Sequence, residues 1–317
     1  MKRVFVQLLV SAFLLGWAAT YLDWTELFDV ATKVRPSTIV LSLVAIQLSF
    51  ACAAARWVRL LKGTVDASTG HHLTHYYRSV FFNFFSPGNL AGDAYRIVAF
   101  RTRAGGLGVM LVAVLKERVL GIVSFSTGLI VCVFAVLASF ASVPEAFIGY
   151  LAISTLGAVA LLSCVVAGPY LLEFVQPRIS TGSGRTETII NGIRQALRFG
   201  DQREFAILMV YSMAALACWL AAVQFLASDL AIGLPIFVIA SIAIVTELAR
   251  LVPISFQGIG VREGTFAALV GLCGADPETG FMLGAISYLV LSLSLIIAGG
   301  AAIFLDLFVI GDRSAVK

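Results

Sequence analysis

The stretch Val252-Pro253-Ile254-Ser255-Phe256-Gln257-Gly258-Ile259-Gly260-Val261-Arg262-Glu263 interrupts an otherwise apolar sequence. A second interruption, Ser86-Pro87-Gly88-Asn89-Leu90-Ala91-Gly92-Asp93-Ala94-Tyr95-Arg96, lies in the first half of the chain. In both, the proline is followed at the fifth position by glycine and at the ninth by arginine. Because proline lacks a backbone N–H and glycine permits open backbone, each stretch predicts a helix that breaks at Pro87 or Pro253 and then restarts. Paired broken helices in the two halves of a membrane protein indicate a transporter's central site.

The composition excludes an ordinary soluble domain. Hydrophobic residues make up 60% of the 317 residues and charged residues 13%, whereas soluble domains carry ~25% charged residues. Six apolar runs are each long enough to cross a hydrocarbon core, which needs about 20 helical residues: 4–22, 38–55, 106–139, 146–170, 204–228 and 279–305. Two further runs, 72–86 and 234–252, end at the breaks. We therefore expect an all-α, polytopic integral membrane protein with about six full spans and two re-entrant broken-helix hairpins.

Basic residues gather in alternate loops. Lysines and arginines lie before the first run, after the second, before the third, throughout the longest polar loop and at the end of the chain. The loops between these hold only Lys33 and Arg35. By the positive-inside rule, both termini are expected to be cytoplasmic. The first run lacks a convincing small-residue cleavage site, so we expect an uncleaved span and not a signal peptide.

The loop charges also predict an internal repeat. We expect a single membrane domain, 1–317, built from inverted repeats 1–143 and 144–317 whose hairpin tips meet near the midplane. In the alternative interpretation, the run 234–252 crosses completely and the second break lies at the cytoplasmic face. The polar region 171–203 would link the repeats. Its helical spacing of isoleucine, leucine and arginine suits either an amphipathic helix on the anionic inner leaflet or a solvated linker.

The restarting helices carry the residues that we expect to bind a ligand. A helix N-terminus favours an anion, and the guanidinium fork of arginine matches phosphate oxygens. The predicted lipid headgroup or phosphate cradle consists of Arg96, Arg262, Asp93, Glu263, Gly92, Gly258 and Gly260. In the alternative interpretation, Arg96 and Arg262 only neutralise nearby carboxylates in a packed charge network.

Further charges lie inside the apolar runs, where each costs about 2.5–3.5 kcal/mol on insertion scales and therefore needs a partner. The predicted intramembrane charge network consists of Lys116, Glu117, Arg118, Glu247 and Arg250. Lys116 begins its triplet ~15 Å into the third run, which places it near mid-membrane or, because the run is overlong, at a shallower depth. Glu247 and Arg250 are three residues apart, so they share a helical face and can pair directly.

The remaining motifs do not indicate a metal, cofactor or catalytic site. His71, His72 and His75 have no evident carboxylate or cysteine to complete a metal site, and the five cysteines lack CxxC spacing. The glycines at 258–264 lack the spacing and the preceding strand of a dinucleotide fingerprint. We expect no metal, no cofactor, no nucleic-acid partner and no catalytic activity.

Four sequence features resemble the membrane domain of the lysylphosphatidylglycerol synthase/flippase family: Arg56-Trp57, Gly92-Asp93 with Arg96, Glu117-Arg118, and the stretch from Pro253 to Glu263. The resemblance covers roughly residues 40–300. It implies an all-helical, flippase-like domain in the bacterial cytoplasmic membrane. In the aminoacylating members a soluble synthetase domain follows, whereas this chain ends at Lys317. We therefore do not expect aminoacyl-tRNA-dependent transfer.

Three hypotheses follow. The first is a lipid translocase that moves an anionic phospholipid, an aminoacylated lipid or a lipid-linked glycan between leaflets, with the phosphate held between the hairpins. The second is a membrane-embedded glycosyl or lipid transferase, which needs an accessible catalytic carboxylate at one face. The third is a non-transporting partner of a separately encoded lipid synthase or glycosyltransferase.

Overall fold

The computed structural model describes residues 32–84, 86, 90–104, 106–139, 144–179, 184–199, 201–250 and 255–305. Within these ranges the chain forms ten helices and no strand, which confirms the expected all-α class. The expected span 4–22 and the helix-breaking residues Pro87 and Pro253 lie outside the described residues.

Five of the described helices are long and apolar enough to cross a membrane. They are α3 (Pro36–Leu60), α6 (Leu107–Ala138), α7 (Glu145–Ile179), α9 (Gln202–Asp229) and α12 (Pro277–Leu305). Each contains most or all of one of the five runs expected after the first, and α7 continues well beyond 170 into the expected linker. Large apolar side chains cover their outer surfaces; Ile153 and Leu156 on α7 are 74% and 71% exposed. The protein is therefore a polytopic membrane protein, whose helices satisfy their own backbone groups.

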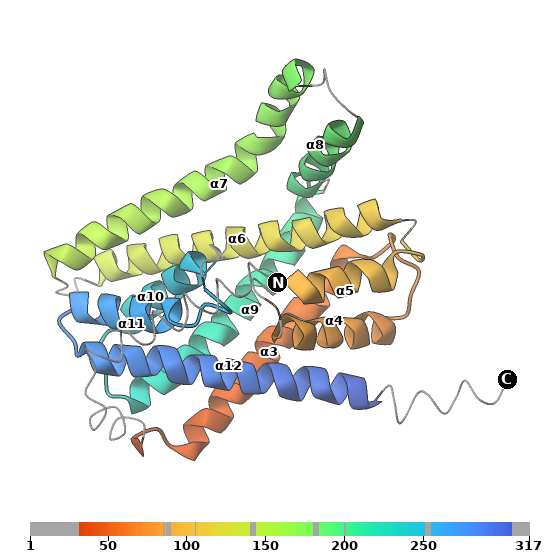
Figure 1. Ribbon diagram of the computed structural model, residues 1–317. Coiled ribbons are helices and arrows are strands. Elements are labelled where there is room, and N and C mark those ends of the chain that lie inside the picture. Colours follow the sequence, from red (N-terminus) through yellow and green to blue (C-terminus); the bar gives the residue numbers. More distant parts are fainter. Residues whose placement is uncertain are drawn as a thin grey trace.

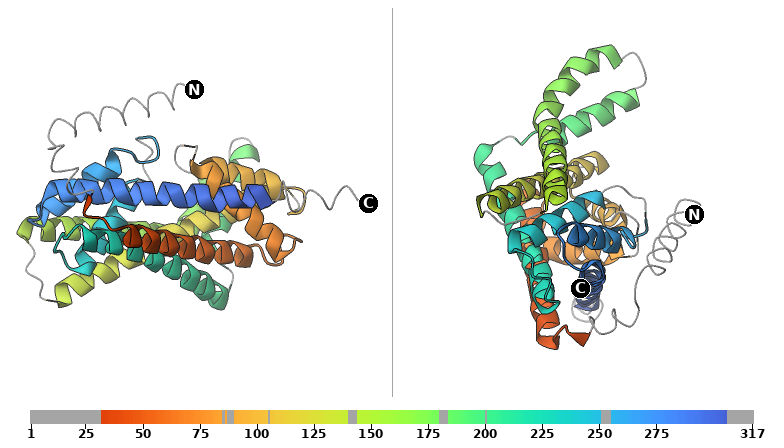
Figure 2. Two further views of the ribbon diagram at one scale, coloured as in Figure 1. Left: turned by 90° about the horizontal axis from the view of Figure 1, so that it is seen from below. Right: turned by 90° about the vertical axis from the view of Figure 1, so that its left-hand side faces the viewer.

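Four shorter helices form two hairpins. The first contains α4 (Thr69–Phe84) and α5 (Leu90–Phe100), and the second contains α10 (Ile236–Ala249) and α11 (Val261–Leu272). Figure 1 shows the hairpins reaching into the bundle from opposite ends, with their tips toward its centre. A fifth short helix, α8 (Gly184–Leu197), packs on α6 and α7 within the expected linker region. Figure 2 shows that α7 and α8 project from one side of the bundle.

Chain connectivity explains why the hairpins have opposite directions. α3 and α9 pack together along their lengths, and an ion pair of 2.5 Å between Arg35 and Asp229 joins the start of α3 to the end of α9. α10 follows the end of α9 after a short loop, whereas α4 follows the end of α3. The open ends of the two hairpins therefore lie about 37 Å apart, the length of the 25-residue helix α3.

The hairpins are packed against long helices from the other half of the chain. α4 lies along α12, and α10 lies along α6. The first contact needs a glycine, because a Cβ atom on Gly299 would lie only 2.1 Å from Phe81 Cβ. The hairpin tips also touch: the side-chain amide of Gln257 donates hydrogen bonds to the backbone carbonyls of Asn83, at 2.6 Å, and Ser86. Segments far apart in sequence thus meet at the centre of the bundle.

Candidate functional site

A buried carboxylate on α6 joins two arginines from different elements. Glu117 accepts a 2.5 Å hydrogen bond from Arg96 Nη1 and a 3.3 Å hydrogen bond from Arg56 Nη2. The exposed fractions are 7% for Glu117, 5% for Arg96 and 9% for Arg56. Removing one partner from such a group leaves an uncompensated buried charge, so the three side chains depend on one another.

Arg96 is fixed from several further sides. Its Nη2 donates to Asp93 at 2.6 Å, and Asp93 also accepts a 2.7 Å hydrogen bond from Arg118. The guanidinium carbon of Arg96 lies 4.2 Å from the ring centroid of Trp57 and 5.3 Å from that of Tyr76. Both terminal nitrogens of Arg96 are thus committed to carboxylates, with aromatic rings beside the guanidinium plane.

The second hairpin repeats this arrangement. Glu247, near the end of α10, accepts a 2.5 Å hydrogen bond from Arg250 Nη1 and a 3.2 Å hydrogen bond from Arg262 Nη2. The pairing of Glu247 with Arg250 that their spacing predicts is therefore present. Arg262 is 3% exposed and its guanidinium lies 4.9 Å from the ring centroid of Tyr288. Glu263 accepts a 2.6 Å hydrogen bond from the backbone N–H of Gly260 and so caps the restarting helix.

The glycines at the breaks shape the backbone around these arginines. Gly258 and Gly260 have φ angles of 79° and 82°, in the left-handed region that favours glycine. A Cβ atom on Gly258 would lie 2.4 Å from Arg250 Nε. Gly92 donates its backbone N–H to the side chain of Asn83 at 2.8 Å, and a Cβ atom there would lie 2.1 Å from the backbone oxygen of Ser79. The absence of a Cβ atom therefore lets the Arg250 side chain pack directly on Gly258, and lets α5 approach the backbone of α4 at Gly92.

A cavity of about 290 Å³ lies between the two charge groups. Its polar lining comes from Ser49, Arg56, Tyr76, Asn83, Ser124, Ser212, Glu247, Arg250, Gln257 and Tyr288, and four aromatic side chains, Phe50, Phe84, Phe125 and Trp219, line the rest together with aliphatic residues. Both lining arginines have a buried Nε without a hydrogen-bond partner. An unpaired buried donor costs about 1–3 kcal/mol, and the Nε of Arg250 lies against Gly258. The charged lining of the cavity itself is Arg56, Arg250 and Glu247, a formal excess of one positive charge that favours an anionic ligand.

The structure shows two layers of charged residues, and none of the seven residues of the predicted cradle is among the lining residues of the cavity. Arg56 and Arg250 line the cavity, whereas Arg96 and Arg262 are not among the lining residues. Arg96 and Arg262 instead donate hydrogen bonds to Glu117 and Glu247, the glutamates that also accept from the two lining arginines. Their expected contact with phosphate stays a prediction, as does the cradle as a whole.

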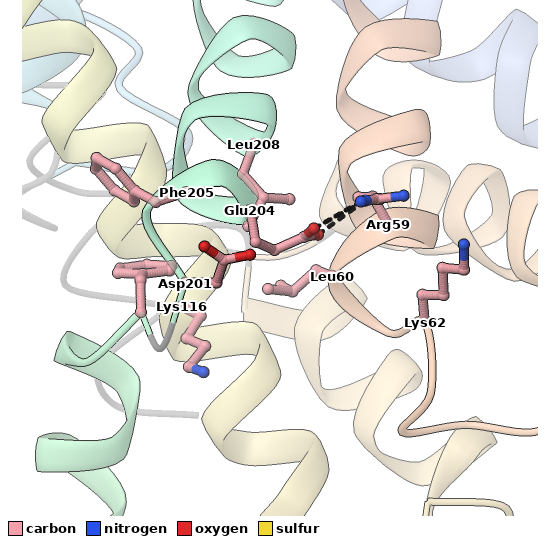
Figure 3. A pocket seen from close by; sticks show the side chains of 9 residues that line it. Arg59, Leu60, Lys62, Lys116, Asp201, Glu204, Phe205 and Leu208 are labelled. Atoms are coloured by element: carbon pink, nitrogen blue, oxygen red, sulfur yellow. Dashed lines mark hydrogen bonds and ion pairs between the residues drawn. The ribbon is translucent and has the colours of Figure 1, made fainter.

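The predicted charge network is not continuous. Lys116 belongs to neither group: its Nζ lies 5.6 Å from the ring centroid of Phe199, and it lines a separate pocket with Arg59 and Glu204 (Figure 3). These neighbours lie in the last turns of α3 and the first turn of α9. Lys116 is therefore close to the end of α3 and the start of α9, which favours the shallower of the two depths that the overlong run allows.

Two residues of the site, Arg56 and Gln257, were not among the predicted binding residues, although Arg56 belongs to one of the four features that resemble the family. Arg56 follows an apolar run and looks like an ordinary basic residue of a cytoplasmic loop, yet it is buried and hydrogen-bonds Ser212 at 2.9 Å. Gln257 looks like a loop residue, yet it links the hairpin tips. The available signal for Gln257 was its position immediately before Gly258 in the break.

The fold and the site define a class: a polytopic α-helical membrane protein with two opposed short hairpins and two Arg–Glu–Arg groups, one buried and one partly buried, beside a central cavity. The model of one protein family, described as the lysylphosphatidylglycerol synthase TM region, matches residues 4–300. The chain therefore belongs to this family, a membrane domain associated with lipid flippase and synthase function. A comparison with curated proteins gives no match.

Proposed function

We propose that the protein is a lipid translocase that takes a phosphate-bearing headgroup into the central cavity while the acyl chains stay in the bilayer. The observation that carries this proposal is the pair of arginines that line the cavity, Arg56 and Arg250. Each donates a hydrogen bond to a glutamate, Glu117 or Glu247. The same glutamate also accepts a hydrogen bond from an arginine behind the lining, Arg96 or Arg262. Arginine stays charged at all physiological pH values and offers a rigid fork of donors to phosphate. Preorganisation of that fork lowers the entropic cost of binding.

Charge counting supports an anionic cargo. In the first group, the guanidinium groups of Arg56, Arg96 and Arg118 face the carboxylates of Asp93 and Glu117, a formal excess of one positive charge. All of these carboxylate groups accept hydrogen bonds from arginines, as Glu247 does in the second group. A cationic headgroup would therefore have to compete for them. Among the cargo classes, we favour an anionic phospholipid over an aminoacylated lipid; a lipid-linked glycan phosphate fits the same donors.

The hairpins supply the means of alternating access. α10 has 14 residues, fewer than the about 20 that a crossing needs, which supports a re-entrant hairpin over a complete crossing. The two hairpins start at opposite ends and pack against exchanged partners, α4 on α12 and α10 on α6 (Figure 1). We infer an inverted repeat in which movement of either hairpin opens the cavity to one leaflet. From the loop charges, we infer cytoplasmic termini. From the family, we infer a bacterial cytoplasmic membrane.

Reconstitution of the purified protein into liposomes tests the proposal. Liposomes would contain fluorescent phosphatidylglycerol in both leaflets, and dithionite would quench the outer leaflet from outside. We expect the wild-type protein and a Lys33→Gln control to expose the inner pool, and Arg56→Gln/Arg250→Gln to protect it. Protection of the inner pool by the wild-type protein, at the level of protein-free liposomes, contradicts translocation. Mass spectrometry of the recovered lipids adds a second arm, because a covalently modified lipid would indicate a transferase instead.

A further inference from the structure

A second pocket, of about 340 Å³, lies where the end of α3 and the start of α9 meet α6 (Figure 3). One wall is apolar, with Leu60, Phe199, Phe205 and Leu208. The remaining lining is charged, and the two acids in it are already engaged. Glu204 accepts hydrogen bonds from Arg59 Nε at 2.8 Å and from Arg59 Nη2 at 2.7 Å. Asp201 caps the start of α9 by accepting the backbone N–H of Arg203 at 3.0 Å.

The lysines of this pocket are not engaged in the same way. Lys116 is partly buried, and Lys62 is exposed at the rim. Neither forms an ion pair within the described part of the chain. Figure 3 shows their ammonium groups on opposite sides of the pair formed by Arg59 and Glu204, so one phosphate cannot be assigned to both. The Phe199 ring, 5.6 Å from Lys116 Nζ, leaves the ammonium group able to accept an anionic partner.

We propose that this pocket binds the phosphate of an inner-leaflet phospholipid, with Lys116 as the phosphate contact and Lys62 as a steering charge at the rim. The apolar wall fits the glycerol and upper acyl region of a lipid. A free phosphate ion would gain no binding free energy from this wall. Anionic lipids are concentrated in the cytoplasmic leaflet, where the loop charges place the end of α3. The chemical class is therefore an anionic glycerophospholipid.

The position of the pocket gives it a role in loading, which rests on the proposed function. Arg59 lines the pocket and Arg56, one helical turn away on α3, lines the central cavity. On α9, Leu208 lines the pocket and Ser212, also one turn away, lines the cavity. The 2.9 Å hydrogen bond from Arg56 to Ser212 joins these helices at the cavity level. The innermost lining residue of the pocket on α9, Leu208, is thus only about one helical turn, ~5.4 Å, from Ser212 of the cavity, so a headgroup that enters at Lys116 can pass inward along α3 and α9.

Native mass spectrometry of the purified full chain tests this site. The variants are Lys116→Gln, Lys116→Arg and the matched control Lys33→Gln, which removes an exposed lysine at the opposite end of α3. On titration with phosphatidylglycerol, we expect Lys116→Gln to retain one fewer tightly bound lipid than the control, and its affinity for that lipid to fall roughly tenfold. Lys116→Arg should retain the lipid because the positive charge remains.

Several results would overturn the assignment. Equal lipid occupancy in Lys116→Gln and Lys33→Gln, at matched thermal midpoints, would remove Lys116 from any lipid site. Displacement of the bound lipid by inorganic phosphate at equal concentration would indicate a phosphate-ion site instead. The Arg56→Gln/Arg250→Gln variant separates the two proposals: it should lose transport yet keep the lipid at Lys116. If the wild-type protein does not transport lipid but this lipid still binds, the result supports the binding site at Lys116 and contradicts only its role in loading.

Discussion

The side-chain amide of Gln257 donates a 2.6 Å hydrogen bond to the backbone carbonyl of Asn83, and this bond joins the tips of two hairpins that are 174 residues apart in sequence. A second hydrogen bond from the same amide reaches the carbonyl of Ser86. Gln257 itself has a φ angle of 55°, which is costly for a residue with a Cβ atom. The contact between the tips thus holds a strained backbone in place, as expected at a functional junction.

Replacing Gln257 separates the hydrogen bonds from the strain. Gln257→Ala should destabilise the protein by about 1–3 kcal/mol because the carbonyls at the first tip lose their donor. Gln257→Gly loses the same hydrogen bonds but relieves left-handed strain of roughly 1–2 kcal/mol, so it should be the more stable of the two. Thermal unfolding in detergent gives the ranking, with Gln224→Ala as the control amide deletion. Midpoints for both variants equal to that of the wild type would contradict the tip contact.

The glycine in the first break is expected to tolerate no side chain. In Gly92→Ala, the new Cβ atom would lie 2.1 Å from the Ser79 carbonyl oxygen, which is backbone and cannot rotate away. Overpacking of this kind costs about 1–3 kcal/mol or more, so α4 and α5 should separate and the thermal midpoint should fall. Gly108→Ala is the matched control, because no heavy atom lies within 4 Å of its added Cβ. Equal midpoints for the two variants would show that α4 and α5 do not pack this closely.

The sequence predicts where the helices of this fold lie better than it predicts which of their side chains point toward the cavity. Apolar runs reveal where long helices lie, because hydrocarbon demands them whatever their neighbours are. Whether Arg56 or Arg96 lines the cavity depends on how α3 and α5 are rotated against α6, and that rotation is set by packing between distant segments. The same applies to Lys116 and Glu117, which are adjacent in sequence but line a pocket and a buried ion group, respectively.

Glu117 should matter for stability before it matters for transport. Glu117→Gln leaves Arg56 and Arg96 without their shared carboxylate, and breaking a buried ion group in this way costs about 3–5 kcal/mol. The exposed Glu173, which pairs with Arg194 and Arg198, offers the control Glu173→Gln with little expected effect. Thermal midpoints of Glu117→Gln, Arg96→Gln and the double variant form a cycle. The double variant should lose less than the sum of the single variants, and strict additivity would mean that the two side chains act independently.

The proposed orientation predicts which loops face the cytoplasm. Asp66, after α3, and Glu145, at the start of α7, are both exposed. The end of α3 and the start of α7 lie at opposite ends of the bundle (Figure 1). On a cysteine-free background in intact cells, an impermeant maleimide should label Glu145→Cys directly and Asp66→Cys only after the membrane is opened. Labelling of both from the same side would contradict the orientation and the inverted repeat. The reverse pattern would keep the repeat and invert the protein.

The division between the arginines that line the cavity, Arg56 and Arg250, and those behind them, Arg96 and Arg262, makes the sharpest prediction for function. Arg250→Lys keeps the charge but loses the fork, so headgroup affinity should fall by roughly ten- to hundredfold, on the order of 1.5–3 kcal/mol. Its thermal midpoint should fall as well, because Arg250 also donates to Glu247 at 2.5 Å and to the backbone carbonyl of Gln257 at 3.3 Å. Arg262→Lys removes a donor to Glu247 and the guanidinium beside Tyr288, so its main effect should be on the thermal midpoint. Arg35→Lys controls for the substitution itself, because the Arg35 side chain is 73% exposed and its ion pair with Asp229 lies at the start of α3, away from the cavity.

Measuring phosphatidylglycerol binding and thermal midpoints for all three variants distinguishes the two layers. If Arg262→Lys loses affinity at a normal midpoint while Arg250→Lys binds like the wild type, Arg262 holds the phosphate and the cavity assignment is reversed. If both variants lose affinity, the double variant decides whether the two arginines bind one ligand. Two arginines that bind the same phosphate should show a smaller loss of binding free energy in the double variant than the sum of the losses in the single variants.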